Sequence, residues 1–214
     1  MSVRIRIELA RLYLRLLSSK NWVLRWRGLV LYVPRGVFTP RFTISTDLLV
    51  ESLEDLGKRV LDLGCGCGAI ALYVAKHFDV EAVGYDPNPL CVAVARINAK
   101  LNNITNVVFT ANRRRVARNE FDTVIVNPPY LPVEPLKNED YGWCCGIDGR
   151  TLIDVLTFAR RISTKRTSVY FAVSSLTPPK LMHVIAEKLG FRPELVNAKR
   201  TPLDTVYVYR LRLH

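Results

Sequence analysis

The residues whose types and spacing could do chemistry gather at Asn127-Pro128-Pro129-Tyr130, directly after the apolar run 123–126. Neither proline has a backbone N–H, so this turn presents carbonyl oxygens and the Asn127 side-chain oxygen as acceptors. Acceptors without donors suit a planar NH2 group, such as an amide or an exocyclic base amine. Hydrogen bonds to Asn127 and the Pro128 carbonyl would orient the delocalised lone pair, with Tyr130 packed flat on the group. We predict a catalytic role for all four residues.

A second cluster is the glycine-rich run 62–68, Asp-Leu-Gly-Cys-Gly-Cys-Gly, where an apolar stretch passes into a helical pattern. Glycines let a ligand approach the backbone closely. The run lacks the G-x-G-x-x-G spacing of a dinucleotide site and the Lys-Ser/Thr of a phosphate-binding loop. Asp86 ends the next strand-like run, where a carboxylate can accept both hydroxyls of a ribose. The two features predict a nucleoside-containing cofactor; a tight turn and a helix-capping Asp86 are the purely structural alternative.

The elements that must position these residues alternate between two periodicities. Short β-rich runs at 60–63, 82–85, 107–109, 123–126, 168–173 and 205–209 predict strands, and helical patterns cover 69–78, 89–102, 151–162 and 179–189. This alternation indicates βαβ units on a parallel sheet. We predict one α/β domain over residues 37–214, without internal repeats.

Residues 1–36 follow a different pattern and predict a basic N-terminal appendage. One helical face carries Ile5, Leu9, Leu12 and Leu16, and the range 22–33 reads as two short strands around Arg27-Gly28. We expect the apolar face of this helix to pack on the main domain. Binding of this basic amphipathic stretch to a membrane or to nucleic acid is the alternative.

The charge is strongly positive, with 31 Lys and Arg against 19 Asp and Glu and a formal net charge of +12. The excess lies in the first 45 residues and in the run Arg113-Arg114-Arg115 with Arg118. Such basic patches attract nucleic acid or an acidic surface without identifying either. A solvated face of a heat-adapted protein explains the charge equally well, and the absence of Gln is typical of such proteins. We predict an archaeal source.

The cysteines and the apolar runs bear on compartment. None of the five cysteines forms a paired CxxC arrangement, so we predict no metal site, and neighbours Cys144 and Cys145 are too close for an unstrained disulfide. No uncharged apolar run reaches 18 residues, and Arg4 and Arg6 stand where a signal peptide would be apolar. We predict a cytoplasmic protein with free thiols and no membrane association.

Residues 37–214 resemble the class I S-adenosylmethionine-dependent methyltransferases that carry N-P-P-Y. Within them the chain looks most like the HemK/PrmC branch of release factor glutamine N5-methyltransferases. Residues 39–41, Thr-Pro-Arg, followed by 46–51, Thr-Asp-Leu-Leu-Val-Glu, are similar to the branch's P-R-P-E-T-E-L-L-V-E with two extra residues between. Residues 143–150, Trp-Cys-Cys-Gly-Ile-Asp-Gly-Arg, with Ile153-Asp154 look like the W-x-G-G-x-x-G-R-x-x-x-D element of the archaeal and eukaryotic type. Cys144 and Cys145 depart from it near where the branch prefers small residues.

The resemblance implies a Rossmann-like fold with helices on both faces of a seven-stranded, mostly parallel sheet of order 3-2-1-4-5-7-6. It implies S-adenosylmethionine as cofactor, with Asp62 and the glycine run at its methionine half and Asp86 at its ribose. Asn112 stands where the branch has an adenine-binding aspartate. The expected cofactor-binding set is Thr46, Asp62, Gly64, Cys65, Gly66, Gly68, Asp86, Pro87, Asn112 and Asn127.

By the same resemblance, the substrate would be the glutamine of the Gly-Gly-Gln motif in a peptide chain release factor. An N-methyltransferase of adenine or guanine in RNA or DNA is the alternative, and a scaffold subunit without catalysis is a further one. Archaeal and eukaryotic members act with a small zinc-binding activator protein. In the expected strand order, residues 106–110 lie at the sheet edge and offer it a docking strand, unless residues 1–36 cover that edge.

Overall fold

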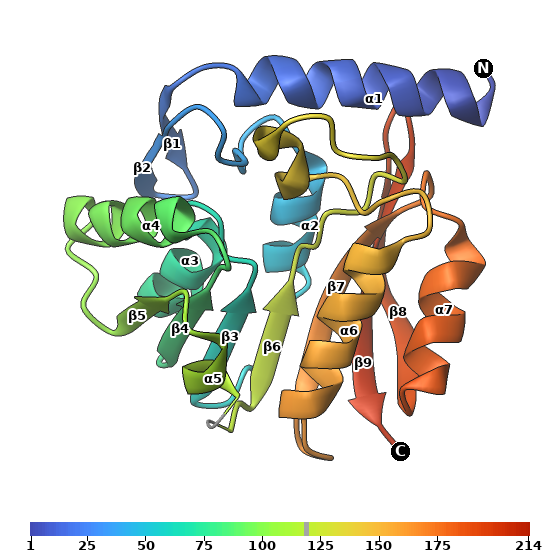
Figure 1. The fold of residues 1–214 in the computed structure, drawn as a ribbon. Coiled ribbons are helices and arrows are strands. Elements are labelled where there is room, and N and C mark those ends of the chain that lie inside the picture. The colour runs from blue at the N-terminus through green and yellow to red at the C-terminus, as the bar shows by residue number, and fades with distance from the viewer. Residues whose placement is uncertain (118–119) are drawn as a thin grey trace.

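The computed structural model describes residues 1–117 and 120–214 and centres on a seven-stranded sheet (Figure 1). Its strands are β3 (Arg59–Leu63), β4 (Glu81–Tyr85), β5 (Val107–Thr110), β6 (Thr123–Val126), β7 (Ser168–Ser174), β8 (Phe191–Arg200) and β9 (Thr205–Leu213). They lie in the order β5-β4-β3-β6-β7-β9-β8. All neighbours are parallel except β9, which runs antiparallel to β7 and β8. The predicted strand order and mostly parallel sheet are confirmed.

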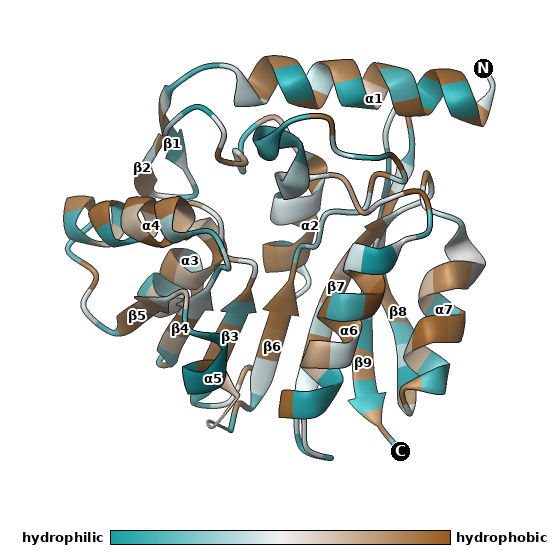
Figure 2. Cartoon of the chain, viewed as in Figure 1, coloured by the Kyte–Doolittle hydropathy of each residue, from teal (hydrophilic) through white to brown (hydrophobic). Residues whose placement is uncertain are grey.

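Helices cover both faces of the sheet, as expected. They are α2 (Ile44–Glu51), α3 (Ala69–His77), α4 (Pro89–Leu101), α5 (Arg113–Val116), α6 (Arg150–Ile162) and α7 (Pro179–Lys188), with a short 3-10 helix η1 (Asn138–Gly142). Two hydrophobic clusters divide the strand residues by alternation: Val60 packs with α2, α3 and α4, and Leu61 packs with α6 and α7. The sheet is therefore buried on both faces, which explains the hydrophobic colouring of its central strands in Figure 2.

β8 is the strand that the sequence pattern did not predict. It carries Pro193 and several polar residues, and its register on β9 shifts between Leu195 and Asn197. As the outermost strand it pairs on one side only, so a proline and a bulge are tolerated there. Neither the alternation nor the composition of a buried strand is needed at this edge.

The N-terminal segment forms α1 (Val3–Ser18) and a hairpin of β1 (Trp22–Trp26) and β2 (Leu29–Val33), as expected around Arg27-Gly28. The hairpin's buried side chains belong to the same hydrophobic cluster as α3 and α4. Asn102, the residue after α4, and Asn98 of α4 form hydrogen bonds with β2 like those of a neighbouring strand. Each side chain accepts from a backbone N–H of β2 at 2.8 Å and donates to the carbonyl of the same residue, Val30 and Tyr32 respectively. The boundary at 36/37 thus does not separate two cores.

The expected orientation of α1 is wrong. Ile5, Leu9, Leu12 and Leu16 are 43–58% exposed, and the opposite face, with Ile7, Ala10 and Leu14, packs on a third cluster of Leu131, Trp143, Cys144 and Leu176. The physical reason is an ion pair on the inward side, where Arg15 Nη2 lies 2.8 Å from Oδ2 of the buried Asp140. The amphipathic pattern predicted a helix, but it did not identify the face that carries this anchor.

Three further expectations concern composition. All five cysteines are buried and unpaired, as predicted. Among the described residues, no helix is long and apolar enough to cross a membrane. Arg118 of the second basic cluster lies outside the described residues.

Candidate active site

The carboxyl ends of β3, β4 and β6 open into a cavity of about 400 Å³. Parallel α/β sheets bind ligands at this edge, where the strand order reverses. The structure brings most of the predicted site residues together around the cavity: Thr46, Asp62, Gly64, Cys65, Gly66, Asp86, Pro87, Asn127, Pro128 and Pro129 all line it. Gly68, Asn112 and Tyr130 are the predicted residues that do not line it.

The glycine loop between β3 and α3 is shaped by its three glycines, all of which have positive φ. Gly64 and Gly66 have no atom within 4 Å of the point where a Cβ would stand, so these positions leave open space beside the cavity. At Gly68 a Cβ would lie 2.8 Å from the Ala95 side chain, so this glycine allows α3 and α4 to approach. The motif therefore combines two positions that leave room for a ligand with one that serves packing.

Two carboxylates fix the loop and leave negative charge beside it. Asp62 Oδ2 accepts from the Ala71 N–H at 3.0 Å, and Asp86 accepts from the N–H groups of Gly66 and Asn88, each at 2.9 Å. Burial raises the pKa of Asp62 to about 7, and the nearby Asp86 adds to this shift. Burial also raises the pKa of Asp86. Each carboxyl would ionise more readily beside a cation, so the pair favours a positively charged ligand.

The thiols of the loop are not nucleophiles. Burial raises the pKa of Cys67 to about 12 and raises that of Cys65 well above its ordinary value. Both side chains therefore stay neutral near pH 7 and act as small apolar packing groups.

Asn127 is held by a contact that the sequence did not reveal. Its Nδ2 donates to the Thr46 hydroxyl at 3.1 Å, and both residues line the cavity. With the amide nitrogen bound in this way, the side-chain oxygen is left as an acceptor next to Pro128 and Pro129, which have no N–H to offer. Thr46, predicted as a cofactor-binding residue, here orients the catalytic candidate.

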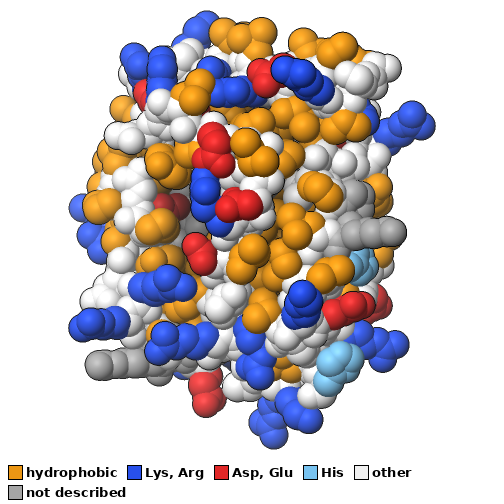
Figure 3. All heavy atoms as spheres, turned by 45° about the vertical axis from the view of Figure 1, so that its right-hand side comes forward, with side chains coloured by type: hydrophobic (Ala, Val, Ile, Leu, Met, Phe, Trp, Pro, Cys, Tyr) orange, Lys and Arg blue, Asp and Glu red, His pale blue; other side chains and the backbone are white. Residues whose placement is uncertain are grey.

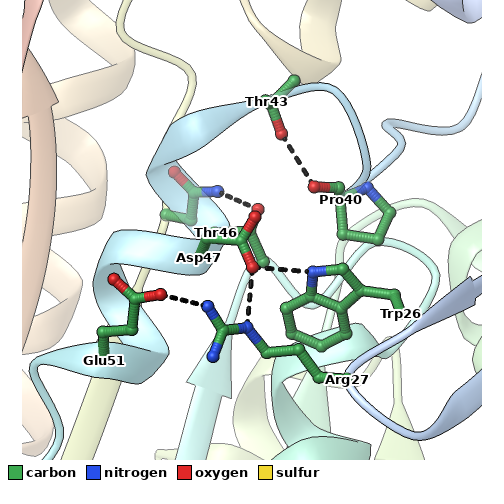
Figure 4. A network of polar contacts seen from close by, with 8 residues as sticks. Trp26, Arg27, Pro40, Thr43, Thr46, Asp47 and Glu51 are labelled. Carbon is green, nitrogen blue, oxygen red and sulfur yellow. Dashed lines mark hydrogen bonds and ion pairs between the residues drawn. The ribbon is translucent and has the colours of Figure 1, made fainter.

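The helix that carries Thr46 is clamped by the N-terminal hairpin (Figure 4). Trp26 Nε1 donates to Asp47 Oδ1 at 3.0 Å, and Arg27 Nε donates to the same oxygen at 2.7 Å. The other end of the Arg27 guanidinium pairs with Glu51. Arg27 itself has a φ of 45°, which is rare for a side chain of its size. The hairpin turn thus holds α2 at two points one helical turn apart.

Tyr130 and Asn112 lie away from the cavity. Tyr130 is half-buried, packs against the cluster of α6 and α7, and accepts a hydrogen bond from Thr177 at its carbonyl; burial raises the pKa of its hydroxyl to about 12. The Asn112 side chain is exposed and caps α5 by accepting from the N–H groups of Arg114 and Arg115. The packing of Tyr130 on a target amide and the binding of adenine by Asn112 stay predictions.

Several lining residues were missed by the sequence reasoning. Arg113 and Phe158 both line the cavity, with the guanidinium carbon 4.3 Å from the centre of the ring. Arg113 is exposed, as the interpretation of the basic cluster as a surface patch predicts, and it also borders the cavity, which the sequence reasoning did not foresee. Tyr141 of η1 also lines the cavity and is 64% exposed, so it stands at the mouth.

Residues 131–145, which follow Tyr130, fold back near the mouth of the cavity, and we call this segment the roof. Leu131 forms a parallel bridge with Cys144, with the Cys145 N–H donating to the Leu131 carbonyl at 2.9 Å. Asp140 of η1 accepts from the backbone of Leu136 and Lys137 and pairs with Arg15. The roof is therefore fixed to α1.

Comparisons with known proteins agree with this geometry. The family model of the methyltransferase small domain matches residues 29–137. A Methanocaldococcus jannaschii protein, named provisionally as a protein N5-glutamine methyltransferase, is 32% identical over 167 residues, which cover 75% of this chain and 85% of that protein. A Pyrococcus horikoshii tRNA (uracil(54)-C(5))-methyltransferase is 42% identical over 89 residues, which cover 41% of this chain and only 22% of that relative.

Among solved structures, the chain resembles the E. cuniculi Mtq2-Trm112 complex, described as responsible for methylation of the eRF1 translation termination factor. The TM-score is 0.62 at 20% identity, over 84% of this chain and 99% of the matched one. At this identity the likeness shows the fold.

Proposed function

Because the chain belongs to the methyltransferase small-domain family, we propose that it methylates the side-chain amide nitrogen (N5) of a glutamine, the one in the Gly-Gly-Gln motif of a peptide chain release factor. The observation that carries the proposal is the pairing of Asn127 with Thr46, which leaves the Asn127 oxygen as an acceptor at the cavity. A primary amide offers the two N–H donors that this oxygen and a neighbouring carbonyl can accept.

The residues present fit S-adenosylmethionine. When bound, this cofactor supplies an electrophilic methyl group on a positively charged sulfur. Gly64 and Gly66 leave the space that a Cβ would fill. Asp62 and Asp86 are buried carboxylates whose ionised forms a cation stabilises. These four residues would hold the cofactor.

On the target side, Asn127 and the Pro128 carbonyl would accept the two amide hydrogens and hold the nitrogen lone pair out of conjugation. The transfer would form an N–C bond as the bond from the methyl carbon to sulfur breaks, and the proton lost from the nitrogen would pass to water. Neither acceptor is a base, so the contribution of these residues is orientation. Pro128 and Pro129 keep competing N–H donors away from the nitrogen.

The release factor as substrate is supported by the resemblance of residues 143–154 to the archaeal and eukaryotic branch and by the name of the M. jannaschii relative. The matched E. cuniculi complex is described as acting on a termination factor. A second candidate is an exocyclic amine of a base in RNA or DNA. The net charge of +12 favours a nucleic acid, and the same acceptors would serve. The tRNA methyltransferase relative also acts on RNA by its name, although on a ring carbon and not on an amine.

A small zinc-binding activator protein is the proposed partner at residues 106–110. β5 is the outermost strand of the sheet, and Val108 on it is 50% exposed. Within the part of the chain that the structure describes, residues 1–36 pair no strand with β5 and pack instead on α4 and on the roof. The edge is therefore open to a partner strand.

The test is a transfer assay with labelled S-adenosylmethionine and, separately, a recombinant release factor, tRNA and ribosomal RNA, each with and without a co-expressed activator. We expect label in the release factor and none after its motif glutamine is changed to alanine. Label in RNA alone would establish the second candidate. Full transfer without any activator would remove the proposed partner.

A further inference from the structure

The outward face of α1 carries an unusually regular apolar seam. Ile5, Leu9, Leu12 and Leu16 follow one another at intervals of four, three and four residues, and all are exposed. An alternation of four and three residues is the spacing by which one helix packs against another in a coiled coil. A shallow hollow runs along the seam, lined by Ile5, Leu9 and Leu12 and by arginines 4, 11 and 15 with Glu8.

The seam cannot turn inward, because the opposite face of α1 is already anchored. Ile7, Ala10 and Leu14 pack on the cluster below the helix, and Arg15 pairs with Asp140 at 2.8 Å. At its C-terminal half, the Tyr13 hydroxyl donates to the Phe42 carbonyl at 2.7 Å. The exposure of the seam is therefore a fixed property of the surface.

The shape of the seam favours a helix as its occupant. A helix that lies on a membrane has a wide apolar face and a polar face in water. In α1 the seam is bordered by the exposed Tyr13, whose hydroxyl is bound to the Phe42 carbonyl, and the opposite face is packed on protein. Four large aliphatic side chains also contribute nothing to phosphate binding, which relies on cations.

The charge of α1 indicates which kind of partner helix would bind to it. The element contains four arginines and one glutamate, a net charge of +3. Figure 3 shows hydrophobic side chains beside Lys and Arg side chains at the top of the molecule, where Figure 1 places α1. A second copy of this chain would bring +3 against +3 within two proteins of charge +12, which is unfavourable. A helix with acidic residues flanking its apolar seam would be attracted.

We propose that α1 is a docking site for an amphipathic helix of a partner protein, with aliphatic residues at heptad spacing and acidic residues on the flank that meets Arg4 and Arg11. This surface is separate from β5 and does not depend on which substrate the cavity accepts. It does lie directly over the active site, because Arg15 holds Asp140 in η1, and Asn138 and Tyr141 of η1 line the cavity. A helix bound here would therefore lie on the opposite side of α1 from the roof of the cavity.

The test uses the full chain and a labelled synthetic helix of about three heptads, with Leu at the two seam positions and Glu at the flanking ones. The glutamates keep this peptide from pairing with itself. We expect saturable binding by fluorescence anisotropy, and binding weaker by about tenfold or more at high salt or when Glu is replaced by Lys. Leu9→Gln with Leu12→Gln should abolish it.

The matched control is Leu101→Gln with Leu195→Gln, two leucines that are 53% and 52% exposed on α4 and β8. This control should bind the peptide as the unaltered chain does. Equal binding of the Glu and Lys peptides, or binding that survives in the α1 variant, would overturn the proposal. So would a dimer in light scattering that the α1 variant loses, or co-sedimentation of the chain with phosphatidylglycerol vesicles in the absence of peptide binding. None of these readouts uses methyl transfer, so they stand apart from the proposed function.

Discussion

The two halves of the cavity are held together by contacts of very different range. On the cofactor side, Asp62 bonds to a backbone group nine residues away and Asp86 to one 20 residues away, within successive βα units. On the target side, Asn127 bonds to Thr46, 81 residues away, on a helix that the N-terminal hairpin clamps. The first half is complete within a local motif, whereas the second is assembled from three distant segments.

The halves also differ in electrostatics. On the proposed cofactor side, burial raises the pKa of both Asp62 and Asp86, so their ionised forms are disfavoured unless a cation is nearby. The target side offers neutral acceptors, which cost little to bury and depend on exact direction instead. Substitutions should therefore change binding and stability on the first side and turnover on the second.

The largest expected effect is that of Asn127→Ala. Loss of the oriented acceptor should raise the barrier by about 3 kcal/mol, about a hundredfold in rate. Cofactor affinity should stay nearly unchanged, since this residue is assigned to the target amide. Single-turnover kinetics measures the first quantity and calorimetry with S-adenosylmethionine the second. A parallel collapse of cofactor binding would show that the two halves are not separable at this residue.

Asp62→Asn should have opposite effects on stability and on binding. The unfolded carboxyl ionises near its ordinary pKa of 3.8 and the folded one near 7, so the folded state holds the extra proton between these values. The free energy of unfolding of the unliganded protein should therefore fall as the pH rises through this window, and then level off. At pH 8 the asparagine should stabilise the protein by roughly 2 kcal/mol, because no charge is buried.

The same substitution should weaken cofactor binding by about tenfold or more, because the attraction to a cation is lost. Thermal unfolding at pH 5 and pH 8, with and without cofactor, measures both effects. A variant less stable than the unaltered chain at pH 8 would contradict the inference that this carboxylate is strained.

Thr46→Val should lower kcat by about tenfold and leave cofactor affinity within a factor of about two. Valine matches the shape of threonine but cannot accept from Asn127, so the amide is free to turn. Ser52→Ala at the C-cap of the same helix is the control, since the Ser52 hydroxyl bonds only to the Leu48 carbonyl of α2 in the described structure. If Thr46→Val changes cofactor affinity instead, the residue belongs to the cofactor side, as first predicted.

The contrast between local and distant contacts also explains what could be predicted from the sequence. The glycine run, Asp86 and the turn after β6 are read from motifs, because consecutive residues and βα periodicity determine their geometry. The partner of Asn127 has no such signal, since Thr46 comes from a helix that no nearby pattern connects to β6. Arg113 is exposed as predicted, but its contact with Phe158 had no signal because that contact joins two helices distant in sequence.

The prediction that the Ile5, Leu9, Leu12 and Leu16 face of α1 packs on the main domain was wrong for a related reason. The sequence showed an amphipathic helix, but the inward face is selected by the pairing of Arg15 with Asp140, 125 residues away. β8 was not predicted because an edge strand needs neither an alternating apolar pattern nor the absence of proline.

The smallest expected effect, and the sharpest test of the long-range half, is that of Arg27→Ala. Arg27 does not line the cavity, but it holds Asp47 and Glu51 on either side of one helical turn of α2. Its side chain is 29% exposed, so loss of both pairs should cost only about 1 kcal/mol of stability. If α2 positions Thr46, kcat should fall about threefold with KM for the cofactor unchanged, and Arg27→Lys should restore part of it.

The double variant with Thr46→Val should be no slower than Thr46→Val alone, because both act through the direction of Asn127. Arg25→Ala on the adjoining strand β1 serves as the control. Additive losses would mean that the hairpin stabilises the fold without orienting the target side of the cavity.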